Sequence, residues 1–187
     1  MSEPIHETAA APSRDANGRG DRVALMLLVP LLLVFVAIVS VFYVFFSALQ
    51  VDGPSMLPTL HDQDRVLLTH GYPVAARGDV IALQATINGQ PDDIIKRVIA
   101  LPGDSVEIRA DVAYVNGVRE PQRGQRIAQD FAVNAPARVV PEGALYVMGD
   151  NRAVSEDSRF IGPIQQAGVM GRAVAVFSPV NRIQMVR

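Results

Sequence analysis

The sequence predicts a mainly β protein that follows a single N-terminal transmembrane helix. Three observations lead to this fold class: a long uncharged apolar run near the N-terminus, a series of short alternating segments after it, and turn residues between those segments. Of the 187 residues, 49% are hydrophobic and 19% are charged. This composition is too apolar for a disordered chain and too charged for a protein that crosses a membrane many times.

The apolar run extends from Val23 to Leu49 without a charged side chain. A helix of this length would measure about 40 Å, more than the roughly 30 Å of a bilayer core. A cleaved signal peptide has a shorter apolar region, of about 7–15 residues, followed by small residues. Here the run ends in large ones, Phe45, Phe46 and Leu49. We therefore predict an uncleaved transmembrane signal anchor over residues 23–49.

The residues that flank the anchor predict its orientation. Residues 1–22 are rich in Ala, Pro, Ser, Gly and charged residues, which favours a disordered tail. Three basic residues of this tail precede the anchor: Arg14, Arg19 and Arg22. The first basic residue after the anchor is Arg65. Because Lys and Arg are retained on the cytoplasmic side, we expect a cytoplasmic tail, one crossing of the cell membrane and an extracytoplasmic domain over residues 50–187.

This outer domain has the patterns of an antiparallel β structure. Seven segments show strand-like apolar patterns: Arg65–Thr69, Asp79–Leu83, Ile94–Ala100, Ser105–Arg109, Val112–Val115, Ala144–Met148 and Val169–Val176. Asn116-Gly117 predicts a tight hairpin turn after the fifth segment. Residues 119–140 have little periodicity, so we expect an exposed excursion there. No long amphipathic helix follows the anchor.

Composition also excludes several kinds of site. Cysteine is absent, so disulfides, thiolate nucleophiles and cysteine-bound metals are excluded. The three histidines, His6, His61 and His70, are scattered and do not have the spacing of metal ligands. A net charge of −2 does not indicate a nucleic-acid-binding surface. We expect no metal, no cofactor and no nucleic-acid partner.

One residue type is nearly missing, because the 17 basic residues include a single lysine, Lys96. In an extended strand, Lys96 shares a face with Ile94 and Val98. Burial on such a face would lower the pKa of the amine and make its neutral form available as a base, which arginine does not offer. The alternative is a lysine whose stem covers apolar surface while its amine reaches water.

Two further segments concentrate residues suited to chemistry. In Gly53–Thr59, the hydroxyl of Ser55 stands between prolines and a glycine that constrain the backbone. Considered alone, this segment is better interpreted as an ordinary turn just outside the membrane. Gly149–Arg159 gathers carboxylates, an amide, arginines and two hydroxyls. On its own it could be a polar turn or a calcium-binding loop, but it lacks the spacing of an EF-hand.

Together these segments resemble the bacterial type I signal peptidases, which are membrane-anchored Ser-Lys endopeptidases of secretion. Four blocks carry the resemblance in order: GPSMLPTL at Gly53–Leu60, RGDVIAL at Arg77–Leu83, IKRVIALPGD at Ile95–Asp104 and GDNRAVSEDSR at Gly149–Arg159. The resemblance implies that residues 50–187 form an antiparallel β-sheet or barrel-like catalytic domain that needs no cofactor. The single lysine falls where this family has its base.

The resemblance also assigns roles by position. Ser55 matches the nucleophile and Lys96 the general base, a variant of the Ser-His-Asp arrangement. Ser155 matches the serine that donates a hydrogen bond to the lysine amine or accepts one from it, and so orients the base. Asp157 and Arg159 match a charged pair that supports the region structurally.

The same comparison by motif implies how a substrate is bound. The amide of Ser55 is expected to stabilise the oxyanion. Gly53 stands where one branch of the family has a serine hydroxyl as a second donor, so a backbone group must serve instead. Met56, Leu60 and Ile95 are expected to line small pockets, because the family cuts after Ala-x-Ala. The substrate would bind as an added strand.

The activity implied is removal of N-terminal signal peptides by a membrane-bound serine endopeptidase. Its partners would be secretory preproteins and membrane lipid, and a secretion translocon is left open. Self-cleaving repressors share the Ser-Lys pair but lack both an anchor and the last block. The remaining alternative is a catalytically silent membrane-anchored β domain that binds exported proteins. Retention of Ser55, Lys96 and Ser155 together disfavours it.

Overall fold

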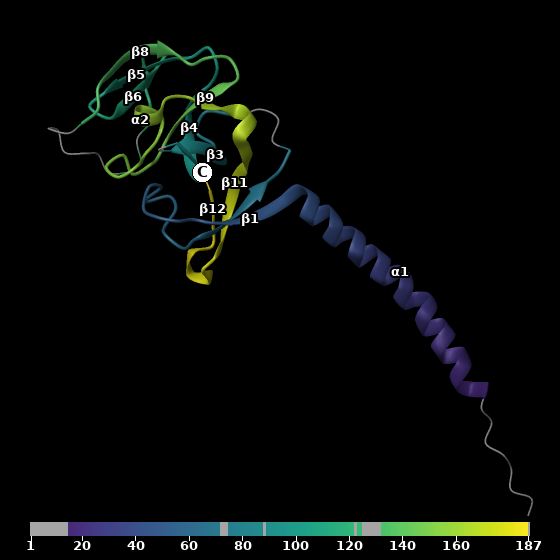
Figure 1. Ribbon diagram of the computed structural model, residues 1–187. Coiled ribbons are helices and arrows are strands. Elements are labelled where there is room, and N and C mark those ends of the chain that lie inside the picture. Colours follow the sequence, from purple (N-terminus) through teal and green to yellow (C-terminus); the bar gives the residue numbers. More distant parts are fainter. Residues whose placement is uncertain (1–14, 72–74, 88, 122, 125–131, 187) are drawn as a thin grey trace, which may run out of the picture. The chain divides into compact units, whose positions relative to one another are not determined.

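The computed structural model describes residues 15–71, 75–87, 89–121, 123–124 and 132–186 (Figure 1). The chain divides into two units, one that ends at Tyr43 and one that extends from Val44 to Arg187. Most of a long helix lies in the first unit. The strands lie in the second, which also contains every residue singled out for chemistry.

The long helix, α1, extends over Asp15–Phe45. Within it, Ala24–Phe45 is long and apolar enough to cross a membrane, with a mean hydropathy of 3.1. Its 22 residues measure about 33 Å, close to the thickness of a bilayer core. The boundaries differ from those predicted for the anchor. The helix begins at Asp15, inside the tail predicted to be disordered, and it ends four residues before Leu49.

The last residues of the apolar run form a strand rather than helix. β1, Phe46–Gln50, pairs antiparallel with β2, Arg65–Thr69, with Phe46 opposite Thr69 and Gln50 opposite Arg65. Hydropathy does not separate the two structures, because a helix that crosses a membrane and a strand of a sheet can both consist of apolar residues. The pairing with β2 decides between them, since it supplies hydrogen-bond partners to the backbone of residues 46–50.

The larger sheet of the second unit has eight strands, all paired antiparallel (Figure 1). Their order is β1-β2-β11-β3-β4-β9-β10, and β12 pairs with β11. The further members are β3 Val80–Ile87, β4 Gln90–Ala100, β9 Ala144–Met148, β10 Ile164–Gln165, β11 Val169–Ser178 and β12 Gln184–Met185. This order places β4, which carries the single lysine, between β3 and β9.

A smaller sheet has the order β7-β6-β5-β8. Its strands are β5 Ser105–Arg109, β6 Val112–Val115, β7 Val118–Arg119 and β8 Ala135–Val139. The predicted hairpin turn is confirmed, because Asn116 and Gly117 both have positive φ angles of 52° and 80°. The predicted excursion over residues 119–140 is wrong where β8 pairs with β5. Residues 122 and 125–131 lie outside the described part of the chain.

Short helical turns complete the second unit. α2, Ser158–Ile161, begins after Asp157, whose side chain accepts a hydrogen bond from the Arg159 N–H as an N-cap. Two 3₁₀ turns follow, η2 at Gln166–Gly168 and η3 at Val180–Arg182. All seven predicted strands are present, although β3, β4 and β11 are longer than the segments predicted for them.

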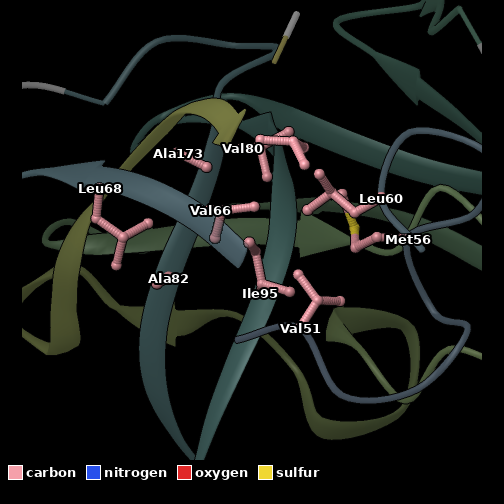
Figure 2. Packing of buried hydrophobic residues seen from close by; sticks show 10 residues of the cluster. Val51, Met56, Leu60, Val66, Leu68, Val80, Ala82, Ile95 and Ala173 are labelled. Carbon is pink, nitrogen blue, oxygen red and sulfur yellow. The ribbon is translucent and has the colours of Figure 1, made fainter. Parts of the chain in front are cut away.

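One core cluster joins the loop between β1 and β2 to the larger sheet (Figure 2). From the loop come Val51, Met56 and Leu60, which pack against sheet residues. Those residues are Val66, Leu68, Val80, Ala82, Ile95, Ala173 and Val176. Met56 and Leu60 are 0% exposed, and burial of each such side chain contributes about 1.5–3 kcal/mol. The loop that contains Ser55 is therefore held firmly against the strands.

Candidate active site

Ser55 lies in the loop between β1 and β2, and hydrogen bonds close this loop. The Val51 N–H donates to the carbonyl of Asp64 over 2.8 Å, which ties the two ends together. Inside the loop the Leu57 N–H donates to the carbonyl of Pro54 over 3.2 Å, so residues 54–57 form a tight turn. Ser55 stays partly exposed on this turn. Among the described residues, none accepts a hydrogen bond from its N–H.

Gly53 sets the direction in which the chain enters this turn. Its φ of +81° lies in the region that favours glycine, and a Cβ built on it would meet no atom within 4 Å. Its N–H donates to Asp62 Oδ1 over 2.8 Å. The glycine is thus required by backbone conformation and not by close packing.

Lys96 lies on β4 opposite Ile81 of β3, with an exposed fraction of 5%. Its Nζ is 2.9 Å from Ser55 Oγ, to which it donates a hydrogen bond. Burial is the largest influence on the amine and lowers its pKa below the ordinary value of 10.5, while the charges of Asp157 and Glu156 act in the opposite direction. The structure therefore brings the predicted nucleophile and the predicted base into contact.

The residue after the lysine forms a buried ion pair that sequence reasoning missed. Arg97 Nε is 2.7 Å from Asp150 Oδ1, and Arg97 Nη2 is 2.6 Å from Asp150 Oδ2. Arg97 also donates to the carbonyl of Gly78 over 2.6 Å. The hydroxyl of Thr59, from the serine loop, donates to Asp150 Oδ2. The pair thus links β4, the loop after β9 and the serine loop beside the Lys96–Ser55 contact.

Gly149, the first residue after β9, allows these loops to approach each other. A Cβ at this position would lie 2.3 Å from Ser155 Oγ and 2.5 Å from the carbonyl oxygen of Ser55. Such distances are shorter than any real side-chain contact, so only glycine is accommodated. The loop that contains Ser155 therefore packs directly on the backbone of the predicted nucleophile.

Ser155 is 4% exposed, but the predicted contact with the lysine is not formed. Its Oγ has no hydrogen-bond partner among the residues that the structure describes. The prediction that Ser155 orients Lys96 through a hydrogen bond therefore differs from the observed arrangement. Ser155 is nevertheless next to the backbone of Ser55, because a Cβ built on Gly149 would lie against both residues.

Asp157 and Arg159 form the ion pair expected of them, with 2.9 Å between Arg159 Nε and Asp157 Oδ1. The second oxygen of Asp157 accepts a hydrogen bond from the Gly149 N–H over 2.9 Å. Arg159 Nη1 also binds Asp111 Oδ1 over 2.7 Å, which reaches the smaller sheet. This network holds the 149–159 loop in shape and does not contact Ser55 or Lys96 directly.

Asn151 is a second residue at the site that sequence reasoning missed. Its N–H donates to the carbonyl of Ser55 over 3.0 Å, and its side-chain Nδ2 donates to the carbonyl of Pro54 over 3.2 Å. Both Asn151 and Asp150 belong to the last motif block, but nothing in the spacing of that block indicates which member touches the serine loop.

Met56 and Leu60, which were expected to line substrate pockets, lie in the buried core instead. Met56 and Leu60 lie at 0% exposure in the core cluster, where Figure 2 shows them among the side chains of Val80 and Val51. The prediction that they line substrate pockets is therefore wrong for this structure. The turn at residues 54–57 explains the difference, because it directs the side chain after Ser55 into the core. Ile95 belongs to the same cluster, at 7% exposure.

The strand that carries Lys96 has one open edge. β9 pairs with β4 only from Arg97 to Ala100, whereas β3 pairs with it from Gln90 to Arg97. Toward the side where β9 ends, residues 90–96 of β4 therefore have no paired strand within the described parts of the chain. An extended peptide could add to the sheet there, immediately before Lys96.

No group of three or more His, Cys, Asp or Glu side chains within the described residues could hold a metal ion. His61 and His70 are exposed.

Comparisons with known proteins identify the family of this chain. The model of the family described as "Signal peptidase, peptidase S26" matches residues 22–178. The chain belongs to this family. A signal peptidase I of Bacillus amyloliquefaciens is 35% identical over 158 residues, with 76% of this chain and 81% of that protein covered. A signal peptidase IB of Staphylococcus aureus strain Mu50 is 35% identical over 153 residues, with 72% and 78% covered.

A solved signal peptidase I from Enterococcus faecalis V583 is 35% identical in sequence, with a TM-score of 0.42. The match covers 54% of this chain and 97% of that one. The family predicted from the motif blocks is confirmed, and so is an enzyme of the signal peptidase I type. The mainly β fold class predicted from the apolar and alternating patterns is confirmed by the strands and the N-terminal helix. In this S26 family member, an N-terminal helix that fits a transmembrane anchor precedes a mainly β catalytic unit.

Proposed function

We propose that this chain is a membrane-anchored endopeptidase that removes N-terminal signal peptides from exported preproteins. In this proposal Ser55 is the nucleophile and Lys96 is the general base. The observation that carries it is the 2.9 Å contact between Lys96 Nζ and Ser55 Oγ, made by an amine that is almost completely buried. A buried, partly desolvated lysine next to a hydroxyl has the properties that a base needs near neutral pH.

The first half of the reaction forms an acyl-enzyme. The neutral amine of Lys96 takes the proton of the Ser55 hydroxyl while Oγ attacks the carbonyl carbon of the scissile peptide bond. The carbonyl oxygen becomes an oxyanion. Collapse of this intermediate breaks the C–N bond, and the lysine ammonium returns its proton to the departing amine of the mature protein. The signal peptide remains attached to Ser55 as an ester.

The second half of the reaction releases the signal peptide. Lys96, neutral again, takes a proton from a water molecule that attacks the ester carbonyl. When the second intermediate collapses, Oγ of Ser55 leaves and recovers its proton from the ammonium. A carboxylic acid is released and the enzyme returns to its starting state, so no cofactor is consumed.

Backbone groups supply the stabilisation of the oxyanion. The Ser55 N–H has no hydrogen-bond partner among the described residues, so it is available as a donor to the developing charge. Gly53 has no side chain to contribute a hydroxyl. The second donor must therefore be another main-chain group or a water molecule.

Ser155 acts in this scheme after the serine has reacted. Once Ser55 Oγ is part of the ester, the Lys96 amine has lost the hydroxyl that it contacts in the free enzyme. The buried Oγ of Ser155, which is unpartnered among the described residues, can then pair with the amine and hold it toward the attacking water. Asp157 and Arg159 support the loop and have no direct part in the chemistry.

The substrate is an extended peptide with small residues before the cleavage site. The open edge of β4 at residues 90–96 offers backbone donors and acceptors that tolerate many sequences. The family preference for Ala-x-Ala would place small side chains against the sheet beside Ile95, which is 7% exposed. Met56 and Leu60 lie beneath this surface, where they support it without touching a substrate side chain.

The proposal includes the membrane and the side on which the enzyme acts. Ala24–Phe45 would cross the cell membrane once, with the tail that contains Arg14, Arg19 and Arg22 in the cytoplasm. The catalytic unit would then face the outside, where signal peptides emerge. Its partners are the exported preproteins and the surrounding lipid.

The test is cleavage of a preprotein with an Ala-x-Ala site by the full chain in detergent or lipid. The wild type is compared with Ser55→Ala and with Lys96→Arg, which keeps a positive charge but cannot release its proton near neutral pH. Ser105→Ala, on β5 of the smaller sheet, is the matched serine control. We expect cleavage by the wild type and the control, and loss in both active-site variants with folding intact.

Three other outcomes of this experiment would contradict the proposal. Full activity of Lys96→Arg would contradict the proposed base. Activity of Ser55→Ala would contradict the proposed nucleophile. No cleavage by the wild type, together with binding of the preprotein, would favour the silent binding domain instead.

A further inference from the structure

We infer that Asn151 is a positioning residue that aims the N–H of Ser55 at the oxyanion of the reaction. This inference rests on the proposed function, because it concerns the same serine. It adds a residue that acts through the backbone of the nucleophile and does not itself touch the substrate.

The contacts of Asn151 converge on the carbonyls of two consecutive residues. Its side-chain Nδ2 donates to the carbonyl of Pro54 over 3.2 Å. Its main-chain N–H donates to the carbonyl of Ser55 over 3.0 Å. The side chain is nearly enclosed, at 6% exposure, so this geometry is held by its surroundings. One residue thus fixes the peptide groups on both sides of the serine Cα.

Because the peptide bond is planar, the hydrogen bond from Asn151 to the Pro54 carbonyl also sets the direction of the Ser55 N–H. The Pro54 carbonyl and the Ser55 N–H belong to the same peptide group, and in a trans group they point in opposite directions. A hydrogen bond that holds the carbonyl on the Asn151 side therefore turns the N–H to the other side. The Ser55 N–H has no hydrogen-bond partner among the described residues. It is also the donor that the proposed mechanism requires.

Without the side-chain contact, this peptide group could rotate. Pro54 and Ser55 lie in a turn on the protein surface, and both are at least partly exposed. The Leu57 N–H also donates to the Pro54 carbonyl over 3.2 Å, but the two residues belong to the same turn and can move together. Asn151 comes from the loop after β9. Its hydrogen bond therefore fixes the position of the Pro54–Ser55 peptide group relative to the sheet.

The chemistry of the side chain explains why this position holds asparagine. A carbonyl accepts hydrogen bonds, so its partner must donate, which an ionised aspartate cannot do. The neighbouring Asp150 is engaged with Arg97 on the other side of the chain and anchors the loop. The orientation of the amide follows from the same requirement, because an oxygen placed toward the Pro54 carbonyl would repel it.

The role predicts a specific kinetic pattern. An oxyanion donor is used in the transition state and not in the bound substrate. Removal of the Nδ2 donor should therefore lower kcat and leave KM nearly unchanged. Deletion of an oxyanion donor lowers kcat by about 10²–10³, and a misdirected donor should cost less than a deleted one. We expect a loss of roughly 10–100-fold in kcat, with KM within about threefold.

The experiment uses the full chain in detergent with a peptide that contains an Ala-x-Ala site. Asn151→Ala removes the side chain, and Asn151→Asp keeps its shape but removes the donor. Both retain the main-chain N–H that binds the Ser55 carbonyl. Asn134→Asp is the matched control, because Asn134 is exposed and, among the described residues, its side chain forms hydrogen bonds with the backbone of Ala110 and Ala132. Thermal unfolding is recorded for each variant.

Two inhibitors separate positioning from a structural role. A peptide aldehyde of the substrate sequence adds to Ser55 and forms a tetrahedral oxyanion or its protonated form. A reduced-amide peptide of the same sequence has no carbonyl oxygen to place near the donor. We expect the aldehyde to lose affinity in both Asn151 variants by about the same factor as kcat/KM. The reduced-amide peptide should bind all variants equally, and the control should match the wild type.

Several results would overturn the inference. Unchanged aldehyde affinity would do so, and so would a rise in KM with an unchanged kcat. A large drop in unfolding temperature for Asn151→Asp would assign the residue to the fold instead. These outcomes differ from failure of the proposed function, which would appear as cleavage by Ser55→Ala or as an inactive wild type.

Discussion

The guanidinium of Arg97 and the carboxylate of Asp150 form a two-pronged ion pair in which neither residue is more than 1% exposed. The pair lies one residue beyond Lys96 on β4 and one residue beyond Gly149 in the loop. Through Thr59 it also contacts the serine loop. All three segments that carry the proposed chemistry therefore meet at one buried charge pair.

Removal of one partner of this pair should be strongly destabilising. Asp150→Ala would leave the Arg97 charge buried without its carboxylate, at a cost of about 3–5 kcal/mol. The double variant Arg97→Met/Asp150→Leu removes both charges and should recover much of that loss. Denaturant unfolding of the three proteins measures the difference. A double variant that is less stable than Asp150→Ala would contradict this account.

At pH values below the lowered pKa of Lys96, the rate of cleavage should rise as the pH rises. Burial lowers the pKa of Lys96 below 10.5, and in the proposed mechanism only the neutral form of this amine accepts a proton. Activity should therefore increase as pH passes upward through the lowered pKa and reach its plateau below the ordinary lysine range. A kcat/KM profile in the full chain tests this. A rate that is already maximal in acid and falls steadily as pH rises would be incompatible with a lysine base.

The same pKa shift predicts how stability depends on pH. Between the lowered folded pKa and 10.5, the unfolded state binds more protons at Lys96 than the folded state does. In this window the wild type should gain stability as pH rises. Lys96→Met has no such group, so it should exceed the wild type most at low pH, and the gap should narrow as pH approaches 10.5. Parallel unfolding curves for both proteins at several pH values provide the measurement, and a gap that is independent of pH would contradict the prediction.

Gly149→Ala should abolish most cleavage. Its new Cβ would overlap both Ser155 and the Ser55 carbonyl, so the loop must move away from the nucleophile. Gly103→Ala is a matched control, because its φ of +84° makes alanine strained although its Cβ would meet no atom within 4 Å. We expect both variants to lose stability but only Gly149→Ala to lose kcat by more than about tenfold. Equal kcat values at matched folded fractions would argue against the close packing.

Met56→Ala should lower stability without changing substrate preference. A buried methionine replaced by alanine costs about 2–5 kcal/mol, and Met56 is fully enclosed beneath the serine loop. Cleavage of peptides with Ala, Ser or Val before the scissile bond should keep the same order of kcat/KM as in the wild type. A new preference for larger residues would instead indicate that Met56 lines a substrate pocket.

The strands of the catalytic unit were largely predictable, because alternation over four or more residues is a strong local signal. The segments Arg65–Thr69, Ser105–Arg109 and Ala144–Met148 match observed strands at both ends. Strands of two residues, such as β7 and β12, carry no periodicity and form only because a neighbour is in place. β1 was hidden for a different reason, since its apolar residues continue the run of the anchor.

The site was predictable only in part, and only because the motif blocks resemble a family. Ser55 and Lys96 are separated by 41 positions, and no local pattern brings them together. Arg97 could have been suspected, because a charged residue between buried apolar neighbours in a strand needs a buried partner. The pairing of Arg97 with Asp150 and the hydrogen bonds of Asn151 to the serine loop depend on how two loops pack. No local sequence pattern predicts that packing. For the same reason Met56 and Leu60 could not be assigned to core or pocket.

The near absence of lysine has a practical consequence for spectroscopy and labelling. Because Lys96 is the one lysine among 187 residues, an isotope label introduced on lysine would report a single side chain without any assignment. The titration of the proposed base could then be followed directly in the intact, detergent-solubilised enzyme. A small amine-reactive reagent would likewise meet a single lysine side chain in this sequence. The amine proposed as the base can therefore be observed without interference from any other lysine of the sequence.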